Sequence, residues 1–101
     1  MRVIAASFLR SFWERNPDAE QQIKSWVGEV KKANWSQPAE IKERYRSASI
    51  LKNRRVVFNI KGNDYRLVVS VAYHYQAVYV KFIGTNEEYD DIDAGTVEME
   101  D

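Results

Sequence analysis

The sequence predicts an α+β fold in which an N-terminal pair of helices packs on a small antiparallel sheet and a short C-terminal helix follows. Two observations predict this fold. Apolar side chains recur with helical spacing between residues 8 and 33, and from Arg54 onward β-branched and aromatic runs alternate with short turns. The chain has 101 residues, of which 45% are hydrophobic, and this is enough for one core. We therefore expect a single domain over residues 1–101.

The N-terminal half of the chain carries the helical pattern. Residues 2–4 are short and β-branched and predict a first strand, whereas residues 8–13 place bulky apolar side chains on one face of a helix. Pro17 cannot continue that helix, but it suits the first position of a second one. The spacing of the following apolar residues predicts that this second helix extends to about Lys32. A further short helical turn is expected within residues 36–44.

The C-terminal half is predicted to form a three-stranded meander. Its strands are expected at residues 56–60, 65–73 and 77–83. Residues 61–64 and 73–76 are the turns between them, and Thr85 is a possible cap for a short helix that reaches about Ala94. Beyond Gly95 the chain offers few side chains to bury, so we expect this end to be frayed.

Charge is distributed unevenly along the chain. Fifteen basic and fifteen acidic residues cancel to a formal net charge of zero, which at face value argues against a nucleic-acid partner. Yet residues 1–84 hold all fifteen bases and seven acids, a net charge of +8, and residues 85–101 hold eight acids and no base. Bases are densest within residues 42–66, where Arg54 and Arg55 are candidate RNA contacts. Such a chain can bind a polyanion if its acidic end lies elsewhere, although charge runs also form ordinary solvated surfaces.

Several kinds of chemistry are excluded by what the sequence lacks. It contains no cysteine and a single histidine, His74, so neither thiolate catalysis nor a Cys/His zinc site is supported. No glycine-rich phosphate loop or nucleophile-elbow motif occurs. We therefore expect neither a metal ion nor another cofactor. No apolar run approaches the ~20 residues of a membrane span, and no signal segment is recognisable, so a soluble cytoplasmic protein without a membrane partner is expected.

Cations at the strand ends are the remaining candidates for chemistry. Arg66 begins the second strand of the meander, Lys81 lies near the end of the third, and Lys61 lies in the turn. Strand ends and turns can bring three such cations together, where they would bind a phosphate and stabilise the charge of a phosphoryl transition state. RNA supplies its own nucleophile, the 2′-hydroxyl, so its cleavage needs no metal. The alternative is that these side chains only keep the sheet edges soluble.

Two ordered motifs make the chain similar to a known family. They are Phe-Asn-Ile-Lys-Gly-Asn-Asp-Tyr-Arg-Leu at residues 58–67 and Val-Tyr-Val-Lys-Phe-Ile-Gly-Thr-Asn-Glu-Glu-Tyr-Asp at residues 78–90. They resemble the HigB toxins of bacterial toxin–antitoxin pairs, whose pattern is approximately F-N-I-x-G-N-x-Y-R-L followed by I-G-T-H-x-E-Y-D. The resemblance spans nearly the whole chain, including the early helix pair.

This resemblance implies a fold, an activity and partners. HigB toxins resemble the wider RelE-like group of ribosome-dependent endoribonucleases, or mRNA interferases, which cut messenger RNA in the ribosomal A site. The expected fold is RelE-like, the expected reaction is metal-independent attack by the RNA 2′-hydroxyl, and the expected partners are messenger RNA, the ribosome and a cognate HigA-like antitoxin. Such an antitoxin is commonly a helix-turn-helix DNA-binding protein.

The resemblance also implies roles for individual residues. Arg66 matches the arginine that would hold the scissile phosphate, and Lys81 falls where relatives place a Lys or Arg. Lys61 and Asn63 belong to the turn beside the site and are expected to contact RNA, although Asn63 also suits the turn itself. Tyr89 matches the tyrosine of the E-Y-D motif, where it would stack on a base or position the 2′-hydroxyl, or would only anchor the last helix.

Asn86 departs from the family pattern, which has histidine at this position. A histidine can exchange a proton near neutral pH, whereas an amide cannot, so cleavage could be impaired while binding persists. Three explanations stay open. The protein uses Lys81, Lys61 or Tyr89 instead, it is a weakened toxin, or asparagine was introduced to protect an expression host.

Two other classes of function compete with an endoribonuclease. A non-catalytic RNA- or ribosome-binding module would use the same cations only to grip phosphates, and a purely protein-binding regulator would have no affinity for RNA. Both RNA-directed functions require that the acidic end avoid the RNA path. A structure that placed residues 98–101 over Arg66 would count against them.

Overall fold

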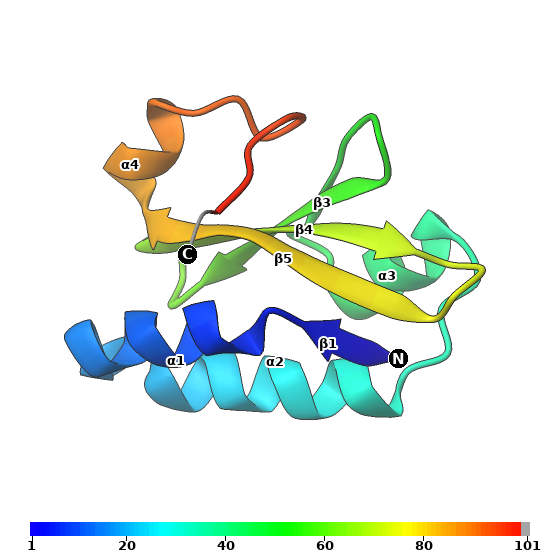
Figure 1. Ribbon diagram of the computed structural model, residues 1–101, viewed down its shortest axis with the longest axis horizontal. Coiled ribbons are helices and arrows are strands. Elements are labelled where there is room, and N and C mark those ends of the chain that lie inside the picture. Colours follow the sequence, from blue (N-terminus) through cyan, green and yellow to red (C-terminus); the bar gives the residue numbers. More distant parts are fainter. Residues whose placement is uncertain (100–101) are drawn as a thin grey trace.

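A computed structural model, which describes residues 1–99, has one five-stranded sheet with the two longest helices on one face and a short helix on the other (Figure 1). The strands are β1 (Arg2–Ile4), β2 (Ser49–Ile50), β3 (Arg55–Ile60), β4 (Tyr65–Ala72) and β5 (Ala77–Thr85). Their order is β1-β5-β4-β3-β2, in which β1 runs parallel to β5 and all other pairs are antiparallel. The predicted α+β fold is thus confirmed, with the meander extended by one short strand at each edge.

The helices form at the positions that the apolar spacing predicts. They are α1 (Ala6–Arg15), a 3-10 turn η1 (Pro17–Ala19), α2 (Glu20–Lys32), α3 (Pro38–Arg44) and α4 (Asn86–Asp90). Pro17 begins a 3-10 turn rather than the second helix itself, and α2 starts three residues later. Helices α1 and α2 lie side by side beneath the sheet (Figure 1). Within the described residues, no helix is long and apolar enough to cross a membrane.

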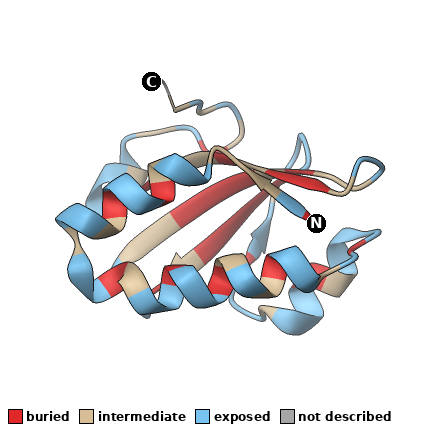
Figure 2. Ribbon diagram, turned by 60° about the horizontal axis from the view of Figure 1, so that its bottom comes forward, coloured by how far each residue is buried: buried red, intermediate tan, exposed pale blue. Residues whose placement is uncertain are grey.

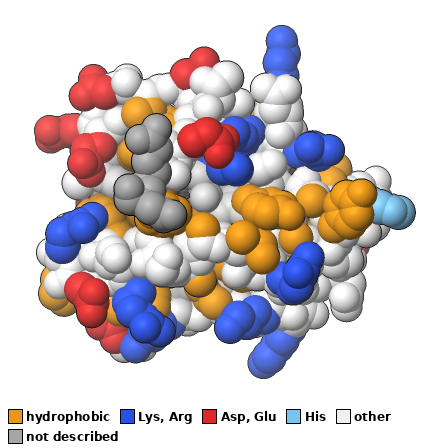
Figure 3. Space-filling model, viewed as in Figure 1, with side chains coloured by type: hydrophobic (Ala, Val, Ile, Leu, Met, Phe, Trp, Pro, Cys, Tyr) orange, Lys and Arg blue, Asp and Glu red, His pale blue; other side chains and the backbone are white. Residues whose placement is uncertain are grey.

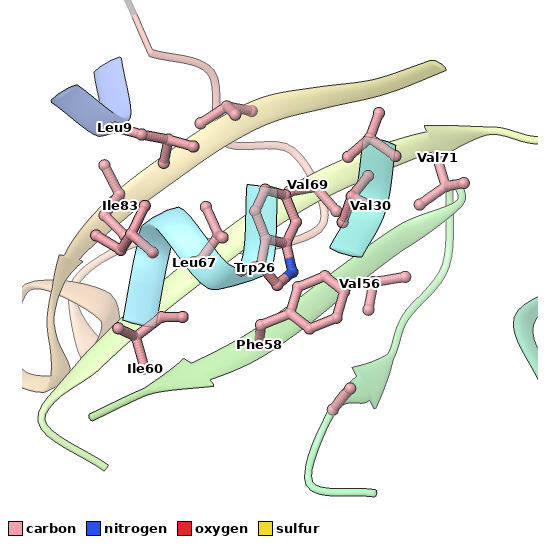
Figure 4. Packing of buried hydrophobic residues seen from close by; sticks show 14 of the residues in the cluster. Leu9, Trp26, Val30, Val56, Phe58, Ile60, Leu67, Val69, Val71 and Ile83 are labelled. Atoms are coloured by element: carbon pink, nitrogen blue, oxygen red, sulfur yellow. The ribbon is translucent and has the colours of Figure 1, made fainter. Parts of the chain in front are cut away.

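The main core lies between the sheet and the two long helices. Phe58, Leu67 and Val69 point toward the helices and meet Ile23 and Trp26 of α2, all of them at most 2% exposed (Figure 4). The Trp26 and Phe58 rings pack edge to face with their centroids 5.3 Å apart. Buried and exposed positions alternate along both helices (Figure 2), as expected of amphipathic helices with one face on a core.

A second, smaller apolar cluster lies on the opposite face of the sheet, which we call the open face. Its members are Val57, Val68 and Ala94, with Leu51, Phe82, Tyr89, Ile92 and Val97 packed against them. Helix α4 and the chain after it cover this cluster (Figure 1). The open face therefore carries its own small core, built largely from the C-terminal part of the chain.

The C-terminal part differs from its prediction in two ways. Helix α4 ends at Asp90 rather than near Ala94, so it has little more than one turn. The chain beyond Gly95 was expected to be frayed, and this is wrong for the described part: Val97 packs on the open-face cluster and Met99 packs against the main core. The residues that Val97 and Met99 pack against include many that lie far away in the sequence. Residues 100–101 lie outside the described residues.

Candidate functional site

Arg66 stands on the open face at the end of the β3–β4 hairpin. It pairs across the sheet with Asn59 on one side and Gly84 on the other. Its guanidinium Nη1 donates to the carbonyl oxygens of Asn63, at 3.0 Å, and of Tyr65, at 3.4 Å. The hairpin turn therefore orients the Arg66 side chain through backbone oxygens. Among the described residues, no carboxylate forms an ion pair with it.

Tyr89 of helix α4 lies beside the Arg66 guanidinium. The guanidinium carbon of Arg66 lies 5.8 Å from the centroid of the Tyr89 ring, which is a cation–π distance. The Tyr89 ring also packs at an angle of 52° against Phe82, with centroids 6.5 Å apart. Tyr89 is thus held by the open-face cluster and presents its ring to the Arg66 cation.

Helix α4 is fixed in place by a capping box and by the hairpin turn. The Thr85 hydroxyl accepts from the Glu88 N–H at 3.1 Å, and the Thr85 N–H donates to the Glu88 carboxylate at 2.8 Å. The N–H of Asn86 donates to the carbonyl oxygen of Asp64 at 3.0 Å. Asn86 is exposed and lies three residues before Tyr89, on the same side of the helix turn. Arg66, Asn86 and Tyr89 therefore gather at one end of the sheet.

Gly84 supports this arrangement, and the sequence reasoning missed it. A Cβ atom at Gly84 would lie 2.6 Å from Cζ of Phe82 and 2.9 Å from the Glu88 carboxylate. Any larger residue would therefore displace either the ring that holds Tyr89 or the capping box of α4. The available signal was a glycine within a strand-like run, which often marks a close approach of other groups.

Lys81 lies further along β5, at a bulge. Val80 pairs with Val69 and Phe82 pairs with Val68, so Lys81 has no partner on β4. Its Nζ lies 2.7 Å from Oε1 of Glu98 and 5.7 Å from the centroid of the Tyr79 ring. The hydrogen bonds and ring contacts of Lys81 are thus made away from Arg66.

The remaining predicted RNA contacts are dispersed. Lys61 lies toward the helix layer: its Nζ is 3.7 Å from the Asp18 carboxylate, and its N–H donates to Gln22 of α2. Asn63 orients Arg66 through its carbonyl oxygen rather than its side chain. Lys61, Lys81 and Arg66 therefore do not form the single three-cation cluster that the strand ends suggested.

The two neighbouring arginines have opposite environments. Arg54 is exposed in the turn before β3. Arg55 is 7% exposed, and its guanidinium donates to the carbonyl oxygen of Val97 at 2.6 Å and to the carboxylate of Glu98 at 2.7 Å. Arg54 is therefore open to a ligand, whereas Arg55 is engaged by the chain itself.

The acidic end of the chain avoids Arg66 as far as the structure describes it. Glu98 bonds Arg55 and Lys81, and the hydrogen bond from Lys81 is the main reason that the pKa of the Glu98 carboxyl lies below its ordinary value. Acidic side chains gather over α4 and the segment after it (Figure 3). The described residues contain no group of three or more metal-ligating side chains, and the His74 ring packs edge to face with Tyr75 in the β4–β5 turn.

Sequence comparison identifies the family. The profile of the HigB_toxin family, described as the RelE-like toxic component of a toxin-antitoxin system, matches residues 19–92, well over half of the chain. The chain belongs to the HigB toxin family. Membership implies an antitoxin partner, and it confirms the resemblance drawn from the two motifs. Both motifs lie within the matched region, and so do Arg66, Asn86 and Tyr89.

Curated members of the HigB family cover nearly the same length. The mRNA interferase toxin HigB of Escherichia coli (strain K12) is 26% identical over 92 residues, which are 89% of this chain and 88% of the relative. The proteins named mRNA interferase HigB from Escherichia coli O157:H7 and from Shigella flexneri match with the same figures. The similarity therefore extends over the helices as well as the site.

Proposed function

We propose that this HigB-family chain is an mRNA endoribonuclease that cuts messenger RNA in the ribosomal A site and is silenced by a cognate HigA-like antitoxin. The observation that carries the proposal is the pairing of Arg66 with Tyr89 on the open face. Among the described residues Arg66 has no carboxylate partner, and a cation held by backbone oxygens beside an aromatic ring suits a phosphate with a neighbouring base. The names of the curated relatives, mRNA interferases, support the same activity.

The proposed reaction needs no metal ion. A base removes the proton of the 2′-hydroxyl, the 2′-oxygen forms a bond to phosphorus, and the bond from phosphorus to the 5′-oxygen breaks. The leaving 5′-oxygen takes up a proton, and the upstream product ends in a 2′,3′-cyclic phosphate. Arg66 would neutralise the charge that develops on the phosphoryl oxygens in the transition state. Tyr89 would position the adjacent base or the 2′-hydroxyl.

Asn86 is the site residue that cannot take part in the proton transfers of this reaction. It is exposed beside Tyr89, where the family pattern has histidine, and its amide cannot transfer a proton at neutral pH. In this chain proton transfer would fall to Tyr89 or to water, because the contacts of Lys81 are made away from Arg66. We therefore expect slow cleavage by the chain as it stands.

The experiment that tests the proposal restores the histidine. Ribosomes programmed with messenger RNA are incubated with the chain or with its Asn86→His variant, and A-site cleavage is measured by primer extension. We expect Asn86→His to cut about 10²- to 10⁴-fold faster, the usual contribution of general acid–base catalysis. Asn86→Gln, which keeps an amide, is the matched control and should not accelerate cleavage.

A second candidate function follows from the same position. If neither the chain nor Asn86→His cuts messenger RNA on the ribosome, the endoribonuclease is rejected and a non-catalytic RNA- or ribosome-binding module is favoured. Asn86 is the observation behind this alternative, because loss of a proton donor leaves the phosphate-binding cation intact.

A further inference from the structure

Glu98 bridges two cations on the open face. Its Oε2 lies 2.7 Å from Nη2 of Arg55, and its Oε1 lies 2.7 Å from Nζ of Lys81. The Arg55 side chain is 8% exposed and that of Lys81 is 22% exposed, whereas the Glu98 side chain is 56% exposed. The two cations are thus largely enclosed, and the carboxylate that joins them reaches in from the solvent side.

The backbone builds this pair of cations independently of Glu98. Arg55 begins β3 and pairs with Ser70 of β4, so it belongs to the open face. Lys81 is the additional residue of the β5 bulge, between strand residues that keep their pairing with β4. Arg55 also donates to the carbonyl oxygen of Val97, which would remain if the Glu98 side chain moved away. The two cations would then face a vacated carboxylate position.

A planar guanidinium and an ammonium that share one carboxylate are also a suitable pair for a phosphate. We propose that Arg55 and Lys81 form a second phosphate-binding subsite for the RNA backbone, and that Glu98 occupies it as an internal competitor when RNA is absent. RNA binding would then displace the Glu98 side chain. The inference rests on the proposed function, since that function supplies RNA as the ligand.

The position of the pair on the sheet favours an RNA strand as its ligand. Arg55 and Asn59, the cross-strand partner of Arg66, lie on the same face of β3 and four residues apart, or about 13 Å along the strand. The Arg66 position and the proposed subsite can therefore hold different phosphates of one strand. Tyr79 lies beside Lys81, as Tyr89 lies beside Arg66, so each cation has an aromatic ring on which a base could stack.

The test measures affinity for a fluorescent single-stranded RNA with 2′-O-methyl riboses, which cannot be cut by the proposed reaction. We expect Glu98→Gln to raise the affinity of the full-length chain about fivefold, because two weak ion pairs no longer compete with the phosphate. Adding Lys81→Ala to Glu98→Gln should abolish the gain.

Glu87→Gln is the matched control, since it removes the same charge from an exposed position of α4. Equal gains for Glu87→Gln and Glu98→Gln would mean a general charge effect and would overturn the proposal, as would an unchanged affinity of Glu98→Gln. If circular dichroism shows that Glu98→Gln is unfolded, Glu98→Asp replaces it. Its carboxylate is one methylene too short to bridge both cations, so a gain of about twofold is expected, and no gain would overturn the proposal. The experiment measures RNA affinity and not cleavage. It therefore tests the Arg55–Lys81 subsite even if the chain proves not to be an endoribonuclease.

Discussion

The two faces of the sheet differ in how much apolar surface they bury and in how many charged side chains they carry. The helix-covered face buries large apolar side chains such as Phe58 and Leu67 against α2, and its members come from every part of the chain. The open face buries only a small cluster, and around it lie Arg66, Lys81 and Tyr89 with polar or charged partners. One face therefore supplies the stability of the fold, and the other presents cations and rings that the fold does not need. The predictions below test this separation.

The largest effect is expected from truncation of a large core residue on the helix-covered face. Phe58→Ala should lower the free energy of unfolding by about 3–5 kcal/mol, because it leaves a cavity beside Trp26. Phe82→Ala is the matched change on the open face, where the ring is only partly buried, and about 1–2 kcal/mol is expected. Urea denaturation of both variants measures the difference. Equal losses would mean that the open face contributes as much stability as the core.

Truncation of Arg66 should reduce cleavage strongly and change the stability of the fold little. Arg66→Ala removes the cation that would stabilise the transition state, so we expect ribosome-dependent cleavage by the Asn86→His form to fall about 10²- to 10³-fold. The free energy of unfolding should change by only about 0.5 kcal/mol, because Arg66 is half-buried and lies outside both apolar clusters. Arg10→Ala removes the same charge from an exposed position of α1 and should leave cleavage nearly unchanged. A large loss of stability in Arg66→Ala would show that the arginine is part of the scaffold.

The smallest effect concerns the pH dependence of the Glu98 contact. Hydrogen bonds, first from Lys81 and then from Arg55, lower the pKa of Glu98 in the folded chain below its ordinary value of 4.5. A carboxyl with a lowered pKa stabilises the fold above the unfolded value and loses this contribution as the pH falls through the folded value. We therefore expect the Val97 and Met99 methyl resonances in NMR spectra to shift only below pH 4.5. A shift between pH 5 and 7 would contradict this assignment.

Glu40 offers an internal comparison for that titration. Its pKa is also lowered, mainly by the hydrogen bond from the Ser36 hydroxyl beside α3. Its titration should move the resonances near Ser36 and leave those of Val97 unchanged. The two carboxyls would then report on the helix layer and on the open face separately.

The elements that the sequence predicts well are those with local signals. The apolar spacing of α2, the proline at its start and the hairpin turn at residues 61–64 all act within a few residues of one another. The parallel pairing of β1 with β5 and the two-residue strand β2 depend on partners elsewhere in the chain. Their sequences carry no pattern of their own that reveals such partners.

The candidate site divides in the same way. The contact of Arg66 with Asn63 lies within one hairpin, and alternation along β4 places Arg66 on the same face as Val68. The contact of Lys61 with Asp18 instead joins the turn to η1, which lies far earlier in the sequence. Glu98 lies 43 positions after Arg55 and 17 positions after Lys81, so no local pattern predicts its bridge between them. Roles for the site residues remain predictions until the variants above are measured.

The bulge at Lys81 allows the ligand-binding surface to change during evolution without a change in strand pairing. Because Val80 and Phe82 keep their partners on β4, Lys81 is an inserted residue on which strand pairing does not depend. Its side chain could be exchanged, or the residue deleted, without moving any strand residue to the other face. A single substitution at residue 81 could therefore change the affinity of this surface for its ligand, while the alternation of side chains that maintains the core stays the same.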